Sequence, residues 1–253
     1  MNTLNKRRLG AVALPVFGAA SILLIWQFLV PALGMPAYIL PTPLAVAAKL
    51  VTDWRFLLEN ARPTIIESAL GFLFGNAVAI LLAIVFVHSR TIRGAYFPVV
   101  LVFNTIPILA LAPIIILIFG LGMLPKVIIA AVICFFPTLV NMVRGLQLQS
   151  ANEMELMRVL SANRVEVFLH LRLPRSVPLL FASLRIAATS CVIGAIVGEW
   201  IGSNQGLGAL IIQSTFNYQS DRLFAAVFIA SALGLIFYGL VAAVEHRFVR
   251  RPR

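Results

Sequence analysis

Most of the polar chemistry in this sequence is concentrated in one stretch, residues 153–178, which reads EMELMRVLSANRVEVFLHLRLPRSVP. This stretch holds three acids, four arginines and a histidine, although 61% of the whole chain is hydrophobic. Such a segment is suited to binding another surface rather than to catalysis. A charged helical segment can anchor at a membrane surface, or it can dock in a groove of a partner protein.

Catalytic and metal-binding patterns are absent from the sequence. Cys134 and Cys191 both fall in apolar runs and are expected to be small core residues, and with three scattered histidines they form no metal-ligand pattern. The sequence contains no phosphate-binding G-x-x-x-x-G-K-[ST] loop, no serine elbow and no H-E-x-x-H. We therefore predict that this chain is not an enzyme and does not itself bind ATP.

The elements that must position the charged stretch are long apolar runs. A bilayer core of about 30 Å needs about 20 apolar residues per helix. Uncharged runs cover residues 9–48, 68–87, 94–125, 127–143 and 223–244, and a sixth segment, 178–201, is apolar apart from Arg185 and Glu199. Helices of soluble proteins keep a polar face, which these runs lack. We predict an all-α membrane protein with six transmembrane helices in one domain, 1–253, whose first span (10–31) is retained rather than cleaved as a signal.

The positions of the charges predict the orientation. With the N-terminus inside, the inner segments hold fourteen of the twenty Lys and Arg residues, namely Lys6, Arg7, Arg8, Arg90, Arg93, Arg144, Arg158, Arg164, Arg172, Arg175, Arg247, Arg250, Arg251 and Arg253, and Arg185 near an inner end makes fifteen. The outer segments hold five, Lys49, Arg55, Arg62, Lys126 and Arg222. Because basic residues accumulate in cytoplasmic loops, both termini are expected in the cytoplasm of a bacterial-type membrane. The net charge of +11 then reflects topology rather than nucleic-acid binding.

The connections between the spans give further local predictions. The sequence LPTP at residues 40–43 marks an extended piece, and helical spacing over 43–61 predicts a short amphipathic helix at the outer surface. Gly71 and Gly75 lie on one face of the second span, a spacing that lets two helix backbones approach closely. We expect the third span to be one helix over 95–120, and residues 202–221 to form a short outer loop.

The charged stretch belongs to the longest predicted cytoplasmic loop, about residues 145–176. Its apolar positions predict two short amphipathic helices joined by a turn at Ser161-Ala162-Asn163, the second helix ending at Pro174, which cannot continue it. A surface anchor needs no sharp internal turn, so the turn favours a projecting docking segment. The anchor stays open as an alternative.

The spacing within this loop resembles the cytoplasmic signature of bacterial ABC importer permeases, Glu-Ala-Ala, three residues, Gly, nine residues, then Ile-x-Leu-Pro. The matching residues here are Glu155, Leu156, Met157, Ser161, Ala162, Leu171, Leu173 and Pro174. Leu156 and Met157 replace the two alanines and Ser161 replaces the glycine. A serine suits a turn, although a left-handed backbone at this position costs more than with glycine. LPTP, the third-span segment and residues 171–211 are also similar to permeases of the nitrate, sulfonate and taurine group, the last segment to its pyrimidine and riboflavin branch.

This resemblance implies a type I importer permease that pairs with a second copy of itself. It also implies a cytoplasmic ATPase dimer that docks at the loop and binds ATP and Mg²⁺, and an extracytoplasmic binding protein that delivers the solute. A heterocycle such as a thiamine-precursor pyrimidine or riboflavin is the expected solute, with nitrate, an aliphatic sulfonate or taurine as alternatives. An ATP-independent secondary carrier is the alternative from another class, but it usually needs a relay of intramembrane acids or histidines.

Four residues are candidates for the translocation pathway. Asn104, Thr105 and Pro107 lie at membrane depth, where irregular backbone is tolerated if it faces protein or water, so they predict either a pathway-lining kink or an ordinary proline bend. Glu199 is expected either at the outer mouth of the pathway or at headgroup level as a hydrated structural residue. Arg185 is expected to extend to the inner surface.

Overall fold

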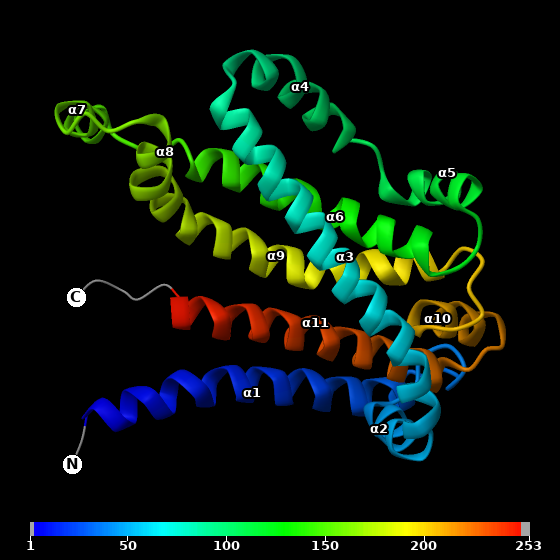
Figure 1. The fold of residues 1–253 in the computed structure, drawn as a ribbon. Helices are drawn as coiled ribbons and strands as arrows, with labels where there is room; N and C mark the ends of the chain where they lie inside the picture. Colours follow the sequence, from blue (N-terminus) through cyan, green and yellow to red (C-terminus); the bar gives the residue numbers. More distant parts are fainter. Residues whose placement is uncertain (1–2, 249–253) are drawn as a thin grey trace. The chain divides into compact units, whose positions relative to one another are not determined.

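The computed structural model describes residues 3–248, and the side chains of residues 3–13, 15 and 248 lie outside that description. Figure 1 shows that the described chain is built of helices, and it contains no strand. The helices are α1 (Thr3–Ala32), α2 (Pro43–Thr52), α3 (Trp54–His88), α4 (Arg90–Phe103), α5 (Ile108–Phe119), α6 (Met123–Gly145), α7 (Ala151–Val159), α8 (Arg164–Val167), the π-helix η1 (Phe168–Arg172), α9 (Leu173–Glu199), α10 (Leu207–Phe216) and α11 (Ser220–Phe248). The predicted all-α class is confirmed.

The chain divides into two compact units, residues 1–58 with 210–228 and residues 59–209 with 229–253. Several basic residues used to predict the orientation lie outside the described part, namely the side chains of Lys6, Arg7 and Arg8 and the whole of Arg250, Arg251 and Arg253. The cytoplasmic position of both termini therefore stays a prediction.

The helix α6 forms the centre of the larger unit. Gly71 and Gly75 of α3 lie against Ala130 and Ala131 of α6, and a Cβ added at Gly75 would lie 2.9 Å from the Cα of Ala131. From α9, Gly194 approaches the same place, where an added Cβ would lie 2.6 Å from the Cα of Ala130. Small residues allow such close backbone contact, which is how helices associate in lipid. The predicted close approach at Gly71 and Gly75 is confirmed.

Four helical stretches are long and apolar enough to cross a membrane, Trp54–His88, Met123–Gly145, Arg164–Glu199 and Ser220–Arg247. A fifth span is possible if α4 and α5 are counted as one, because together they pass the same test although they are bent by 101°. The described apolar part of α1, Val16–Ala32, is shorter. Large apolar side chains are exposed on these helices, such as Phe17 at 74% and Leu117 at 86%, as expected for surfaces that face lipid or another membrane subunit.

The third predicted span is not one helix. α4 ends at Phe103 with Asn104 as its C-cap, and α5 begins after Pro107, whose backbone is extended. A proline removes a backbone donor and restrains the residue before it to extended conformations, so Pro107 prevents α4 from continuing. The single helix predicted over 95–120 is wrong, and a full break stands where at most a kink was expected.

The smaller unit is held by capping and ion pairs. Pro43 starts α2 and the Thr42 hydroxyl accepts a hydrogen bond from the Ala45 amide, which explains the LPTP sequence. Asp53 follows α2 and accepts hydrogen bonds of 3.1 and 2.8 Å from the Arg222 guanidinium. Partial burial raises the pKa of Asp53, but the hydrogen bonds from Arg222 and Lys49 outweigh it and hold this pKa below its ordinary value.

Two further differences from the sequence-based expectation concern the connections. The amphipathic helix predicted over 43–61 ends at Thr52, and the residues from Trp54 onward belong to the long helix α3. The predicted loop 202–221 contains the helix α10. In both places an apolar helical pattern runs across a short break, and a pattern alone does not show to which helix it belongs.

The contact between α3 and α6 gives the first testable prediction. Gly75→Ala places a methyl group onto the Ala131 backbone, and overpacking of this kind costs about 1–3 kcal/mol. We expect a lower midpoint of thermal unfolding for this variant in detergent, followed by circular dichroism.

The control is Gly239→Ala in α11, where an added Cβ meets nothing within 4 Å. This variant should unfold at the wild-type temperature or slightly above it, because alanine favours a helix over glycine. Equal unfolding midpoints for the two variants would show that the close approach of α3 and α6 does not contribute to stability.

Candidate functional site

The charged stretch folds into two short helices that each begin with a capping box. The Ser150 side chain accepts from the Glu153 amide and Glu153 reaches back to the Ser150 amide, which starts α7. Asn163 and Glu166 repeat the arrangement and start α8. Capping boxes satisfy backbone donors that a helix start leaves free, so both starts are specified locally by the sequence. The predicted helix before the turn and a helix start after it are confirmed, but the second helix is not short, because α8 continues into η1 and α9.

The turn between them contains one residue in the left-handed region. Ser161 has φ +51°, and the Ser161 and Ala162 amides donate 2.9 Å hydrogen bonds to the carbonyls of Arg158 and Met157, closing the end of α7. A left-handed serine costs more than the glycine of the permease signature would at this position. The side chains around the turn are exposed although apolar, with Leu156 at 58% and Leu160 at 66%. The segment 150–164 is therefore a sharply turned, apolar-tipped projection.

The prediction that the helix after the turn ends at Pro174 is wrong. α8 passes into the π-helix η1 and then into α9, where Pro174 occupies the first turn, and the Leu173 amide donates to the Phe168 carbonyl five residues back. The wider π-turn comes directly before Pro174. A proline has no backbone N–H, so it cannot donate the hydrogen bond that an α-helix would require at this place. Leu171 and Leu173 are half-buried and Pro174 is exposed. An ion pair between Arg175 and Glu153 ties α7 to the start of α9.

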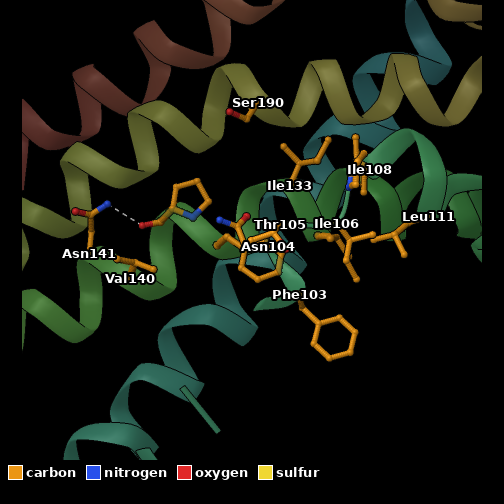
Figure 2. A pocket seen from close by; sticks show the side chains of 14 residues that line it. Phe103, Asn104, Thr105, Ile106, Ile108, Leu111, Ile133, Val140, Asn141 and Ser190 are labelled. Carbon is orange, nitrogen blue, oxygen red and sulfur yellow. Dashed lines mark hydrogen bonds between the residues drawn. The ribbon is translucent and has the colours of Figure 1, made fainter. Parts of the chain in front are cut away.

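A pocket of about 540 Å³ lies at the break between α4 and α5. Its wall comes from the break, from α6 and from α9, and consists of Phe103, Asn104, Thr105, Ile106, Pro107, Ile108, Leu111, Val132, Ile133, Phe136, Pro137, Val140, Asn141 and Ser190. Figure 2 shows Asn104 and Thr105 at the break, Asn141 on α6 and Ser190 on α9. Three of the four candidate pathway residues, Asn104, Thr105 and Pro107, are thus brought together in one wall.

The polar groups of this pocket are amides and hydroxyls. The Asn141 side chain donates 2.8 Å to the Pro137 carbonyl, drawn as a dashed line in Figure 2, which leaves its oxygen as an acceptor. Thr105 donates 2.7 Å to the Val102 carbonyl. Asn104 and Ser190 form no side-chain hydrogen bond with any residue between 3 and 248. The wall contains no charged side chain and offers apolar and aromatic surface with a few hydrogen-bonding groups, as small-molecule sites do.

The fourth candidate, Glu199, lies outside this pocket. It ends α9 and is 1% exposed. The Thr64 hydroxyl donates 2.6 Å to one carboxylate oxygen and the Gly208 amide donates 2.6 Å to the other, while the Leu207 amide donates 2.9 Å to Thr64. Hydrogen bonds to a buried charged group are among the stronger ones in proteins. Glu199 and Thr64 therefore hold the chain between α9 and α10 against α3.

Sequence reasoning missed the two charged residues next to this cluster. Glu67 of α3 is 2% exposed and forms a 3.1 Å ion pair with Lys126 of α6, which also donates 2.8 Å to the Ser203 hydroxyl. Glu67 stands directly before one uncharged run, and Lys126, which divides two others, was counted with the outer segments. The sequence did contain a signal for this pair. A charged residue at the border of an apolar membrane helix needs a partner, and Glu67 and Lys126 both lie at such borders.

The comparisons with known proteins agree with this geometry. Residues 75–250 match the family model described as binding-protein-dependent transport system inner membrane component. The chain belongs to this family. It is a multi-pass inner-membrane permease subunit of an ABC importer and is not itself catalytic.

Similar proteins support this assignment over nearly the full length. An ABC transporter permease protein of Haemophilus influenzae is 33% identical over 93% of this chain and 96% of its own length. A riboflavin transport system permease of Chloroflexus aurantiacus is 31% identical over 99% and 94%, and a formylaminopyrimidine transport permease of Halalkalibacterium halodurans is 30% identical over 89% and 90%. An inward-facing structure of a methionine ABC transporter matches the fold with a TM-score of 0.60 and 20% identity, over 79% of this chain and 99% of that one.

The Glu199 cluster gives the second prediction. Glu199→Ala removes the acceptor of the Gly208 amide, and Thr64→Ala removes the acceptor of the Leu207 amide. A hydrogen bond to a charged group contributes about 1.5–3 kcal/mol, so amide hydrogen exchange in the segment 200–208 should be at least about tenfold faster in Glu199→Ala. Hydrogen–deuterium exchange with mass spectrometry measures this directly.

Thr189→Ala in the middle of α9 is the matched control, because the Thr189 hydroxyl bonds only within its own helix, to the Ile186 carbonyl. Exchange in the segment 200–208 should be unchanged in this variant. If Glu199→Ala also left that exchange unchanged, the cluster would not hold the segment.

Proposed function

We propose that this permease transports a small uncharged or weakly polar heterocycle, of the kind of a thiamine-precursor pyrimidine or riboflavin, through the pocket at the break between α4 and α5. The observation that carries the proposal is the composition of the pocket wall. Amide and hydroxyl groups of Asn104, Asn141 and Ser190 suit the ring nitrogens and carbonyls of a heterocycle, and Phe103 and Phe136 supply flat apolar surface.

Anionic solutes are the alternative within the same importer class. A nitrate, an aliphatic sulfonate or taurine carries a negative charge that a buried site normally matches with Arg or Lys. Among the residues that the structure describes, no cation lines this pocket. Relatives named for riboflavin and formylaminopyrimidine transport are 31% and 30% identical to this chain, and one named for aliphatic sulfonates is 27% identical. Both lines of support favour the heterocycle.

The proposal for energy coupling rests on the projecting turn. The segment from Glu153 to Leu173 would dock in a groove of a partner ATPase, with Glu155, Leu156, Met157, Ser161 and Ala162 at the contact and Leu171, Leu173 and Pro174 joining it to α9. ATP and Mg²⁺ would be bound by that partner. A difference in how the segment docks in the two states of the ATPase would shift the permease between inward- and outward-open forms.

The remaining partners follow from the same assembly. A second copy of the chain would complete the pathway, since Asn104, Thr105 and Pro107 are exposed in the single subunit. An extracytoplasmic binding protein would deliver the solute at the opposite end of the spans. Glu199 would act there by holding the segment between α9 and α10, and so as a positioning residue.

Docking of the turn gives the third prediction. Ser161→Arg places a long charged side chain at the tip of the projection, where it cannot enter an apolar groove without losing its hydration. We expect the ATPase to be lost when this variant is purified gently from the native membrane. We also expect uptake of the solute to fall to background.

Ser161→Gly is the matched variant, because glycine adopts the left-handed conformation at φ +51° without the cost that serine incurs. It should retain the ATPase in equal amount and maintain uptake. Full uptake by Ser161→Arg would contradict coupling through this turn and would point to an ATP-independent carrier.

The pocket gives the fourth prediction. Asn141→Leu keeps the branched side-chain shape but removes the acceptor oxygen and the donor to the Pro137 carbonyl, and Ser190→Ala removes a hydroxyl from the same wall. Losing one hydrogen bond costs about 0.5–1.5 kcal/mol, and leaving a buried solute group without a partner costs more. Uptake of labelled riboflavin or aminopyrimidine should therefore fall about tenfold in Asn141→Leu, while the ATPase still co-purifies.

Thr189→Val controls for a change in α9 next to Ser190 but outside the pocket wall, and it should leave uptake unchanged. Sulfonate, taurine and nitrate are measured in parallel. The proposed solute class would be rejected by two results together. One is that neither heterocycle is taken up, and the other is that uptake of one of these three solutes is fully retained in Asn141→Leu.

A further inference from the structure

Three arginines lie in a second pocket, of about 390 Å³, in the larger unit. The pocket lies at the end of that unit from which the segment 150–164 projects, and this segment is called the coupling segment below. Its wall is formed by the last turns of α3, the first turn of α4, the connection from α6 to α7 and the π-helix η1. The residues are Phe86, Val87, Arg90, Arg93, Gln147, Gln149 and Arg172. The wall contains no acidic side chain.

These arginines are not neutralised within the described part of the chain. Arg90, Arg93 and Arg172 form no ion pair and no side-chain hydrogen bond with residues 3–248. Other arginines of the same unit are paired, Arg175 with Glu153 and Arg185 with Glu245 at 3.3 Å. Arg90, Arg93 and Arg172 differ from these two in having no acidic side chain in the wall that they share.

Arg172 carries the strongest indication. Its Nε atom is buried and has no hydrogen-bond partner. A buried donor on a charged group without a partner is costly, and the cost increases when two further cations lie in the same pocket. An anion that accepts hydrogen bonds from several guanidinium groups would remove this cost, because the planar guanidinium matches the oxygens of a phosphate in pairs.

The backbone around the pocket suits the same ligand. α4 begins at Arg90 with Ser89 as its N-cap, so the positive end of a fourteen-residue helix lies in the wall. Gln147 adds an amide that forms no side-chain hydrogen bond with the described residues, and Gln149 donates 2.8 Å to the Leu146 carbonyl. Phe86 and Val87 supply an apolar edge where the span α3 ends.

We propose that this pocket binds a phosphate group, presented either by the headgroup of an anionic lipid or by a free phosphate. A basic pocket at the cytoplasmic ends of membrane helices is suited to anionic headgroups, and the distribution of basic residues predicts that this end is cytoplasmic. The bound phosphate would join α4 to the connection that leads into α7 and to the π-helix that leads into α9. It would thus stabilise the base of the coupling segment.

The experiment uses the transporter purified with its ATPase. The complex is transferred into phosphatidylcholine nanodiscs that contain roughly 20–30% phosphatidylglycerol. Native mass spectrometry then measures the anionic lipid retained per permease. We expect retained lipid to fall about tenfold in Arg93→Gln and in Arg172→Gln, since each variant removes charge-assisted hydrogen bonds. Arg62→Gln, which alters an exposed arginine of α3 outside this pocket, is the matched control and should retain lipid like the wild type.

A second measurement distinguishes the two sources of phosphate. Thermal unfolding in neutral detergent is followed with inorganic phosphate and, separately, with short-chain phosphatidylglycerol. Stabilisation by phosphatidylglycerol alone, lost in Arg93→Gln, identifies a lipid headgroup site, and stabilisation by inorganic phosphate, lost in the same variant, identifies a free phosphate site. Either result supports the proposal.

Two outcomes would overturn it. Equal lipid retention and equal phosphate stabilisation in Arg93→Gln, Arg172→Gln and Arg62→Gln would show that the pocket binds no phosphate. Alternatively, the pocket variants could lose the ATPase while lipid and phosphate have no effect on the wild type, which would assign the arginines to acidic side chains of that partner. Neither outcome bears on the solute pocket, because Arg90, Arg93 and Arg172 lie outside it.

Discussion

The contact of α3 and α9 with the backbone of α6 at Ala130 and Ala131 is the constraint on which the larger unit depends. Lipid tails are as apolar as leucine, so helices in a membrane gain little from burying apolar surface and associate through close packing instead. The glycines at 75 and 194 allow this packing, and side chains there would separate the helices. The helix α6 contributes to each site described above: its middle lines the pocket at the break between α4 and α5, its start carries Lys126 and its end leads to Gln147.

The two ends of this three-helix core differ in how their charges are satisfied. At the end near Glu199, Lys126 pairs with one oxygen of Glu67, and Thr64 and the Gly208 amide donate to Glu199, although the second Glu67 oxygen is buried without a hydrogen-bond partner. At the other end, Arg175 pairs with Glu153, but Arg90, Arg93 and Arg172 have no anionic partner among the described residues. A satisfied buried cluster rigidifies its surroundings, whereas an unsatisfied one gains free energy when a partner arrives. The first end is therefore mostly paired within the unit, whereas the second is where the phosphate proposed above would supply a partner.

The sequence was sufficient where local rules decide the structure. Apolar runs located the long helices, and the spacing of Gly71 and Gly75 predicted a close helix contact. The turn at Ser161 could be placed because helix-starting residues surround it. The break before α5 and the continuation through Pro174 were not predicted, because a proline can end, kink or begin a helix and tertiary contacts decide which occurs. The pairing of Glu67 with Lys126 joins positions 59 residues apart, and no local pattern contains such a pair.

The continuity of the helix after the turn has a mechanical consequence. Residues 164–199 form one helical rod of 36 residues, about 54 Å at 1.5 Å per residue, with the turn at one end, Ser190 in the solute pocket and Glu199 at the other end. Had Pro174 ended the helix, a flexible joint would separate the turn from the pocket. Because the rod is continuous and Glu153 ties α7 to it through Arg175, movement of the projecting turn must displace α9 along its length. The wall of the pocket that carries Ser190 would then move with the turn, so an ATPase docked as proposed on the segment from Glu153 to Leu173 would have a physical means of changing that pocket.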